Sequence, residues 1–447
     1  MNIGPLIGFF KNDGHFKGVI KNSSWLLSAN TVGLGIDFLH TIVLARRLGV
    51  KDYGLLALIS TYVIIVNQVI DFRVWETVVR YVSEFWVKEQ KEKAVSAVKL
   101  CYLIDIAAGM VAFIIAVLSS KLAACYIIHA PDVYQLIVLY SVSLLFSTAN
   151  GTSTAVLRVF DRFQRLSIYA VGTKMTRLVL VFCFLLAGYG LRGVIIAYIV
   201  AELFGGILLS ALAFSVFRDH LWTARNAGIL LIKDRFKEIG HFLLNTNLNE
   251  TATLFTMNID VVLLGYFRDP AEVGFYKLAK NIVSLMGTII DPFYQALYPV
   301  LSKMWASRQA VEFKRMILKA TLLMSGLNFP LLTLIYIFIP FVVEWTVGRN
   351  FMSVVPSVRI MLWGMLIAAV FFWCRPALLS MGKANVLTIA NVFGSVTMLA
   401  LSFILVPKSG YIGSSLMFVY PYLTGHIIAI LYFFRFLKNE SVGNAYQ

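Results

Sequence analysis

The stretch ARRLGVKDYGLLAL, residues 45–58, decides the interpretation of the fold, because it places three cations and one acid between two long apolar runs. A second charged turn, GYFRDPAEVGFYKLAK, occupies residues 265–280. A shift of 220 residues brings the two turns into register and aligns several pairs of glycines and acids: Gly54/Gly274, Gly190/Gly410, Gly193/Gly413, Gly205/Gly425, Asp71/Asp291 and Asp52/Glu272. We interpret this pattern as an internal duplication, with the charged turn as the first hairpin of each half.

The composition predicts a polytopic membrane protein. The chain has 447 residues, of which 59% are hydrophobic and 14% charged, whereas soluble domains average roughly 45–50% and about 25%. In a soluble protein the net charge of +16 would suggest nucleic acid. Here it indicates positive cytoplasmic loops and anionic lipid, so no nucleic-acid partner is expected. We expect the four cysteines to be buried apolar residues, with neither a disulfide nor a metal site.

Twelve apolar runs are long enough to span a bilayer as helices, which need roughly 20 residues each. They are Trp25–Leu44, Gly54–Val79, Val95–Leu118, Val133–Leu157, Ile168–Ala187, Val194–Phe217, Phe242–Phe267, Val273–Leu301, Ile317–Phe341, Val358–Leu379, Val386–Val406 and Tyr411–Phe434. The prediction is therefore an all-α fold of two six-helix lobes. Because six is even, both lobes insert the same way and are related by a pseudo-two-fold axis along the membrane normal.

The distribution of Lys and Arg sets the expected topology. They concentrate in alternate connections, which places that side and both termini in the cytoplasm. The N-terminus has no small-residue cleavage site, so we expect an interfacial segment in place of a signal peptide. The predicted order is this segment (1–23), an N-lobe (24–220), a cytoplasmic linker (221–240), a C-lobe (241–437) and a cytoplasmic tail (438–447). The expected location is the cytoplasmic (inner) cell membrane.

The first charged turn resembles that of Wzx-type polysaccharide flippases of the multidrug/oligosaccharidyl-lipid/polysaccharide (MOP) exporter superfamily. Their Ala-Arg-x-Leu-Gly-x-x-x-Tyr-Gly turn is matched by Ala45, Arg46, Leu48, Gly49, Tyr53 and Gly54. Asp71 and Phe72 match an Asp-Phe-Gly-like bend in the second helix, where Arg73 replaces the glycine. The resemblance implies two six-helix lobes around a central cavity. It also implies transfer of polyprenyl-diphosphate-linked oligosaccharide from the cytoplasmic to the outer leaflet, for cell-surface polysaccharide biosynthesis.

Cations inside the predicted spans are the candidate substrate-binding residues. A diphosphate needs charge-assisted hydrogen bonds, which Arg and Lys supply, and a charge within a span is costly unless it faces a cavity or a partner. The candidates for a cationic lumen are Arg73, Lys174, Arg177, Lys277, Lys280 and Arg375. The alternatives are snorkelling at helix ends and pairing with internal acids, such as Glu76 three residues after Arg73.

The seventh predicted span is too polar for a lipid-facing helix and is expected to line an aqueous cavity. Its Glu250, Asn258 and Asp260, together with Asp37 of the first span, are the candidates for coupling to H⁺ or Na⁺. Hydrogen bonding between helices is the alternative for each. No catalytic residue and no other cofactor is expected.

Two other functions compete with the flippase. A cation or drug antiporter of the multidrug and toxic-compound extrusion (MATE) type shares the architecture, but its cationic substrates favour an acidic cavity. A membrane glycosyltransferase or polymerase needs a constellation of catalytic acids, and the longest outward connection, 342–357, carries a single acid. We therefore expect no enzyme. The expected partners are the lipid-linked saccharide, membrane lipids and a polysaccharide polymerase or ligase.

Overall fold

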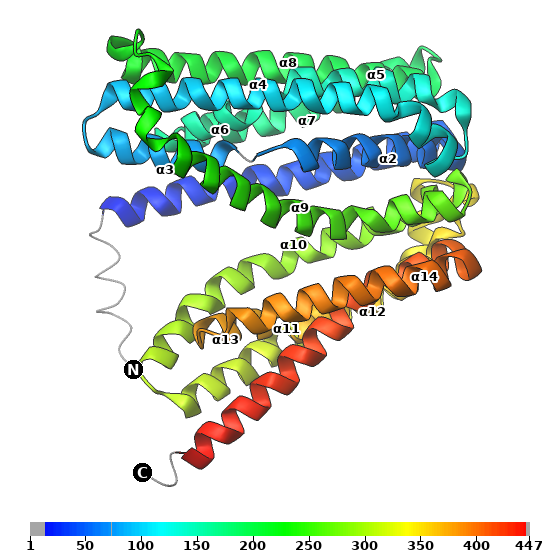
Figure 1. The fold of residues 1–447 in the computed structure, drawn as a ribbon. Coiled ribbons are helices and arrows are strands. Elements are labelled where there is room, and N and C mark those ends of the chain that lie inside the picture. Colours follow the sequence, from blue (N-terminus) through cyan, green and yellow to red (C-terminus); the bar gives the residue numbers. More distant parts are fainter. Residues whose placement is uncertain (1–13, 73, 444–447) are drawn as a thin grey trace. The chain divides into compact units, whose positions relative to one another are not determined.

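The described part of the chain is entirely helical. The computed structural model describes the backbone of residues 14–72 and 74–443 and their side chains, except those at 14–24, 27, 245–246, 248–257, 288–292, 295–296, 384 and 437–443. No strand is present in this part (Figure 1). The helices cluster into two compact units, formed by residues 1–40, 59–126 and 130–257 and by residues 41–58, 127–129 and 258–447.

The first unit contains the helices before the middle of the chain. They are α2 (Gly14–Ile70), whose residues 41–58 belong to the second unit, α3 (Val74–Val87), α4 (Lys91–Leu122), α5 (Tyr134–Ser147), α6 (Asn150–Val159), α7 (Phe163–Leu186), α8 (Gly190–Leu221) and the beginning of α9 (Phe236–Phe267). Short turns complete it: a π-helical turn over Ala123–Ile127 and 3₁₀ turns over Pro131–Val133, Trp222–Ala224 and Ile229–Arg235.

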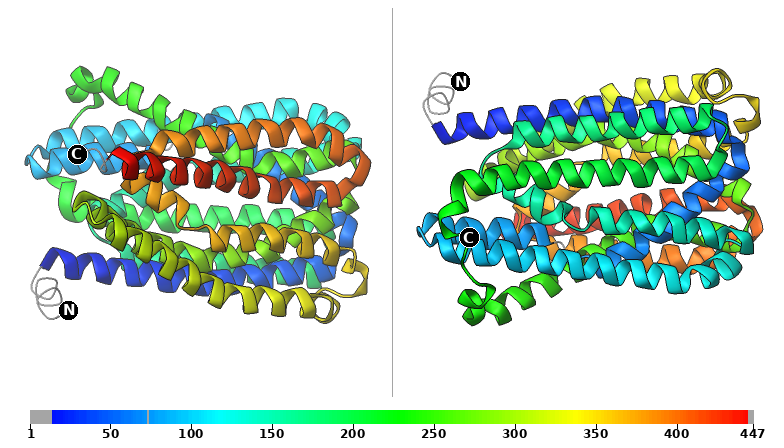
Figure 2. Two further views of the ribbon diagram at one scale, coloured as in Figure 1. Left: turned by 90° about the horizontal axis from the view of Figure 1, so that it is seen from below. Right: turned by 90° about the horizontal axis from the view of Figure 1, so that it is seen from above.

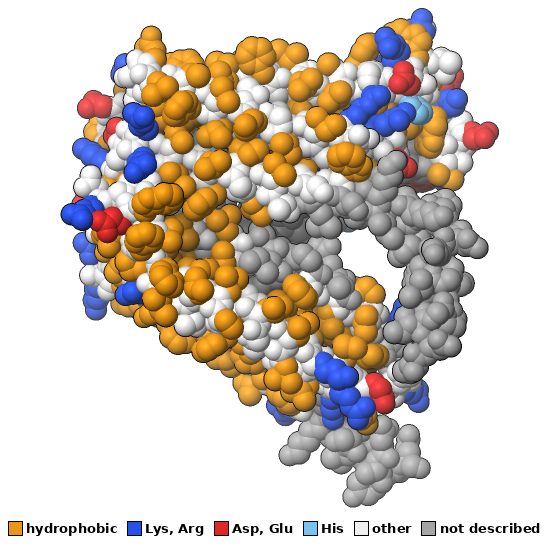
Figure 3. Space-filling view, turned by 180° about the vertical axis from the view of Figure 1, so that it is seen from behind, with side chains coloured by type: hydrophobic (Ala, Val, Ile, Leu, Met, Phe, Trp, Pro, Cys, Tyr) orange, Lys and Arg blue, Asp and Glu red, His pale blue; other side chains and the backbone are white. Residues whose placement is uncertain are grey.

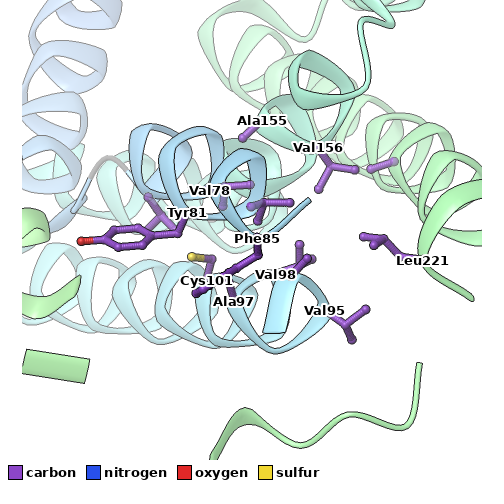
Figure 4. Close-up of a cluster of buried hydrophobic side chains, with 14 of the residues drawn as sticks. Val78, Tyr81, Phe85, Val95, Ala97, Val98, Cys101, Ala155, Val156 and Leu221 are labelled. Carbon is purple, nitrogen blue, oxygen red and sulfur yellow. The ribbon is translucent and has the colours of Figure 1, made fainter. Parts of the chain in front are cut away.

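The second unit contains the remaining helices. They are the end of α9, then α10 (Pro270–Ala306), α11 (Ala310–Thr346), α12 (Val354–Val370), α13 (Cys374–Ser380) and α14 (Ala384–Gly443), with a 3₁₀ turn over Arg349–Phe351. Within each unit the long helices run alongside one another in the other two views as well (Figure 2). Each unit has its own buried core. In the first unit, apolar side chains of α3, α4 and α6 meet around Tyr81 and Phe85 (Figure 4).

The prediction of an all-α polytopic membrane protein is confirmed. Eight stretches of the described residues are long and apolar enough to cross a membrane, and two of them, Ser28–Val87 and Asn385–Phe436, each contain two predicted spans. With α9 and α10 they account for the twelve predicted helices. In Figure 3 hydrophobic side chains cover the length of the described helices and charged ones gather toward their ends, as expected of a surface that faces lipid.

Left-handed glycines break the long helices at repeat-related points. Gly49 (φ 75°) divides α2 between the first and second predicted spans, and Gly410 (φ 56°) divides α14 between the last two. Gly190, the counterpart of Gly410 at the shift of 220 residues, begins α8 with φ 54°. A side chain with a Cβ rarely adopts this conformation. The same unusual backbone at equivalent positions supports the duplication inferred from the sequence.

The second charged turn is a structural tie. The Arg268 guanidinium donates to the carbonyl of Pro407 at 2.6 Å, and the Glu272 carboxylate accepts from the backbone N–H of Tyr411 at 2.8 Å. These bonds satisfy backbone groups that the break at Gly410 releases. The turn thus fastens the α9–α10 hairpin to the break in α14.

Three predicted continuous spans are broken in the structure. The second span was predicted as Gly54–Val79, but α2 ends at Ile70 and α3 begins at Val74. Asn247 of α9 accounts for this break, because its amide donates to the carbonyls of Asp71 at 2.5 Å and Val69 at 3.5 Å. Backbone carbonyls freed inside a membrane need such internal partners.

The fourth and tenth spans are broken in related ways. The fourth divides into α5 and α6 at residues 148–149, and the tenth divides into α12 and α13 at residues 371–373. Asp105 of α4 accepts hydrogen bonds from the N–H of Thr152, at 2.9 Å, and from its hydroxyl, at 2.6 Å, and so caps the start of α6. Pro376 occupies the first turn of α13, where a missing N–H does no harm.

The cysteine prediction was half wrong. All four cysteines are free, and Cys101 and Cys374 are buried as expected, but Cys125 and Cys183 are exposed. Both lie close to the ends of long apolar helices, Cys125 after α4 and Cys183 near the end of α7. A small apolar residue loses little there, because the surrounding lipid is as apolar as a protein core.

The segment that connects the two sequence halves packs on the first unit. The Lys99 ammonium donates to the carbonyls of Arg225 and Ala227 at 2.7 and 2.9 Å. Farther along, Arg235 donates to Glu238 at 2.6 Å, and this hydrogen bond lowers the pKa of the Glu238 carboxyl. Several side chains of the first unit thus hold the segment in place.

Candidate functional site

Two acid–base pairs lie deep within helices of the first unit. Lys174 of α7 pairs with Asp37 of α2 at 2.5 Å, and Arg177, one turn farther along α7, pairs with Glu202 of α8. Arg177 precedes the end of α7 at Leu186 by nine residues, which is about 13 Å at a rise of 1.5 Å per residue. The pairs therefore lie close to the middle of a hydrocarbon layer ~30 Å thick.

These pairs connect two predictions that were made separately. Lys174 and Arg177 were proposed as substrate cations and Asp37 as a coupling acid, and the structure joins Lys174 directly to Asp37. The pairs are half-exposed: the side chains of Arg177 and Glu202 retain 41% and 27% of their accessible surface. A cation with its counterion beside it can stay charged in the membrane and can exchange that partner for an anionic ligand.

Aromatic side chains surround the Arg177–Glu202 pair. The ring centroid of Tyr198 lies 5.3 Å from the guanidinium carbon of Arg177, and its hydroxyl lies 3.3 Å from Nε2 of His40. The ring of Tyr140, from α5, lies 6.1 Å from that of Tyr198. A guanidinium held over a tyrosine face gains a cation–π interaction of about 0.5–2 kcal/mol.

A pocket of about 180 Å³ opens at this point of the first unit. Its lining comes from three helices besides α7, and the polar members are Asn67, Gln68, Tyr140, Ser143, Ser147, Arg177, Tyr198 and Glu202. The buried Nε of Arg177 has no hydrogen-bond partner among the described atoms. A buried donor without a partner costs about 1–3 kcal/mol, which a polar ligand or water in the pocket would relieve.

Sequence reasoning missed most of this pocket, although a helical period was present. Tyr140, Ser143 and Ser147 recur at spacings of three and four along α5. Tyr198 and Glu202 are four apart on α8. Such spacings place polar groups on one face of a helix. In an apolar helix this is the signal that would have identified the lining.

The second unit contains a buried acid–base cluster. Asp260 of α9, 8% exposed, accepts hydrogen bonds from the Lys280 ammonium at 2.5 Å, from the Tyr276 hydroxyl and from the N–H of Val261 at 2.8 Å. Lys277 lies one turn before Lys280 on α10 and interacts electrostatically with both Lys280 and Asp260. Two lysines therefore share the vicinity of one carboxylate. Asp260, a predicted coupling acid, and Lys280, a predicted substrate cation, form one site.

The remaining predicted site residues differ in what the structure shows. Arg375 is exposed on α13, and its guanidinium carbon lies 5.4 Å from the ring centroid of Tyr294. Asn258 is half-buried two residues before Asp260. Arg73 and the side chain of Glu250 lie outside the described residues. The structure thus forms two separate clusters, one in each unit.

The sequence matches known families over most of its length. It matches the family described as "Polysaccharide biosynthesis protein" over residues 19–305, and the MatE family over residues 248–404. Inner membrane protein YghQ of Escherichia coli K12 is 23% identical over 293 residues, which cover 65% of this chain and 82% of that protein.

The fold is similar to that of solved transporters. An inward-facing multidrug resistance MATE family transporter of the MOP superfamily has a TM-score of 0.72 at 14% identity, with 89% of this chain and 92% of that chain covered. The lipid II flippase MurJ, in an inward closed conformation, has a TM-score of 0.70 at 14% identity, with coverages of 92% and 87%. The matched polysaccharide model covers more than half of the chain. This chain therefore belongs to the polysaccharide biosynthesis protein family, and it is a multi-pass membrane transporter of the MOP superfamily.

Proposed function

We propose that this transporter is a flippase that moves polyprenyl-diphosphate-linked oligosaccharide from the cytoplasmic to the outer leaflet of the cell membrane by alternating access. The observation that carries the proposal is the excess of cations around Asp260. Lys277 and Lys280 share this one carboxylate, so a positive charge remains for an anion. A diphosphate is the anion that a lipid carrier of sugars presents, and ammonium groups bind it by charge-assisted hydrogen bonds.

Ion coupling follows from the same cluster in this proposal. A diphosphate that binds Lys280 competes with Asp260 for that ammonium. The released carboxylate then binds H⁺ or Na⁺, because an unpaired carboxylate at this depth is costly. Asp37 would act in the same way when a ligand takes Lys174, and Asn258 and Glu250 are further coupling candidates on α9. Arg375 and Arg73 remain proposed contacts of the substrate.

The proposed orientation has both termini in the cytoplasm of a cell with an inner membrane. Family membership supports a role in polysaccharide biosynthesis, and the similarity to the lipid II flippase MurJ supports flipping as the transport mode. A polymerase or ligase that receives the flipped saccharide is the proposed protein partner. The two units carry the proposed N-lobe and C-lobe.

The test is the leaflet position of the lipid-linked saccharide in cells that lack the protein. A membrane-impermeant enzyme or lectin would measure the outward-facing fraction against the total pool. We expect cytoplasmic accumulation, with rescue by the wild-type chain and by Lys314→Ala, an exposed lysine on α11. Lys277→Ala and Arg375→Ala should fail to rescue. An unchanged leaflet distribution in the deletion strain would refute the flippase.

A MATE-type cation or drug antiporter is the second candidate. The match to the MatE family over residues 248–404 and the TM-score of 0.72 to a MATE transporter favour it. A cationic substrate would be drawn to Asp260 and repelled by Lys277 and Lys280. In this case the deletion strain would become sensitive to cationic drugs, and Lys277→Ala would keep or improve resistance.

A further inference from the structure

The pocket of the first unit differs chemically from the lysine cluster of the second. Its only charged lining residues, among those described, are Arg177 and Glu202, and they neutralise each other. A diphosphate in this pocket would gain one cation and meet one carboxylate directly beside it. The pocket is therefore a poor diphosphate site, and its ligand should be polar without a strong negative charge.

The neutral lining groups offer hydrogen bonds in both senses. Asn67 and Gln68 each carry an amide with two donors and an acceptor. The hydroxyls of Ser143 and Ser147 donate to carbonyls of their own helix, at 2.7 and 3.1 Å. Each of these oxygens keeps lone pairs for an incoming donor. Sugar hydroxyl and acetamido groups both donate and accept, so they match this mixture.

The aromatic groups complete the match. The rings of Tyr140 and Tyr198 line the pocket with their planes inclined at 57°. Ring faces accept the C–H face of a sugar, while phenolic hydroxyls remain free to bond its edges. The Nε–H of Arg177, which lacks a partner in the described structure, adds one more donor. The pocket volume of about 180 Å³ equals roughly six water molecules at ~30 Å³ each, enough for one sugar ring.

We propose that this pocket, lined by Asn67, Gln68, Tyr140, Arg177, Tyr198 and Glu202, is a saccharide subsite that recognises a single neutral, hydroxyl- or acetamido-bearing sugar of the lipid-linked substrate. The proposal rests on the proposed flippase function and adds to it a division of labour. The pocket selects the sugar, and the diphosphate is held by cations elsewhere in the chain. Arg177 then acts as a donor to the sugar, held in place by Glu202.

The test compares two ligands that differ only in the sugar. The full-length protein, reconstituted in lipid nanodiscs, would be titrated calorimetrically with polyprenyl diphosphate carrying one N-acetylhexosamine and with bare polyprenyl diphosphate. The pocket variants are Gln68→Leu and Tyr198→Phe. Their matched controls are Gln135→Leu and Tyr189→Phe, which replace exposed residues outside the pocket.

The expected outcome is selective. Each pocket variant should bind the sugar-bearing lipid about three- to tenfold more weakly, the equivalent of one lost hydrogen bond. Binding of the bare lipid should not change, and both controls should match the wild type on both lipids. Equal weakening on both lipids, or no weakening on either, overturns the subsite.

The wild-type protein separates this proposal from the one on which it rests. If the wild type binds both lipids with equal affinity, the sugar subsite is overturned while the flippase stands. If it binds neither lipid, the flippase and the subsite fall together. A preference of the wild type for the sugar-bearing lipid that disappears in Gln68→Leu and Tyr198→Phe supports the subsite.

Discussion

Replacement of Gly54 by alanine tests the closest approach between two helices of the second unit. A Cβ at Gly54 would lie 1.7 Å from the carbonyl oxygen of Pro270 and 2.9 Å from the amide nitrogen of Gly274. The contact is reciprocal, because a Cβ at Gly274 would lie 2.5 Å from the carbonyl oxygen of Val50. Val50 and Pro270, like Gly54 and Gly274, are counterparts at the shift of 220 residues. The two halves of the duplication therefore meet here through equivalent backbone.

The magnitude follows from what must move. The neighbouring atoms are backbone, so the helices themselves must separate until the 1.7 Å contact of Gly54→Ala reaches at least 3.4 Å. Overpacking of this kind costs about 1–3 kcal/mol, and more in severe cases. The gain in helix propensity from glycine to alanine offsets about 1 kcal/mol. We expect a net loss of about 2 kcal/mol for Gly54→Ala. Gly274→Ala should lose less, since its closest contact starts at 2.5 Å.

The assay is thermal unfolding of purified variants in one detergent, with wild type and Gly326→Ala measured alongside. Gly326 is a helical glycine of α11 with no atom within 4 Å of its added Cβ, so this control should melt at or above the wild-type temperature. The double variant Gly54→Ala/Gly274→Ala should lose less than the sum of its parts, because one separation of the helices relieves both contacts. A Gly54→Ala protein as stable as wild type, or a strictly additive double variant, would refute the close contact.

Three further predictions concern polar groups and topology. Asp260→Ala should destabilise the fold by about 3–5 kcal/mol by leaving Lys280 buried without its partner, whereas Asp260→Leu/Lys280→Met should recover most of this loss in thermal unfolding; equal losses would contradict the pairing. Asp105→Leu should cost about 1–3 kcal/mol through two lost bonds to Thr152, and Asp105→Asn, which keeps an acceptor, should cost less in the same assay. Cys125, exposed after α4 on the predicted outer side, should react with a membrane-impermeant maleimide in intact cells and lose this labelling in Cys125→Ser; labelling only after lysis would reverse the proposed orientation.

The positions of the helices could be predicted because their causes are local. A segment in lipid must satisfy its backbone hydrogen bonds within itself, so an apolar run of sufficient length is sufficient evidence for a helix. The glycines at Gly49 and Gly410 also acted locally, since a left-handed backbone needs no distant partner. The duplication was visible for the same reason, as a pattern of single residues.

The breaks within spans were missed because distant residues stabilise them. The carbonyl of Asp71 is satisfied by Asn247, which lies 176 residues away, and the start of α6 is capped by Asp105, 47 residues away. Hydropathy reports only the average polarity of a segment. It contains no information about which polar side chain of another helix reaches a released backbone group.

The sequence by itself determined that this chain spans a membrane, that it is built from a repeated set of helices, and which charges lie inside the apolar runs. Only the tertiary structure decided how those charges are used. It paired Lys174 with Asp37 and Arg177 with Glu202, placed two lysines beside Asp260, and brought Tyr140 of α5 next to Tyr198 of α8. The physical reason is that a buried charge is tolerated through its partner, and partners from different helices meet only when the helices pack.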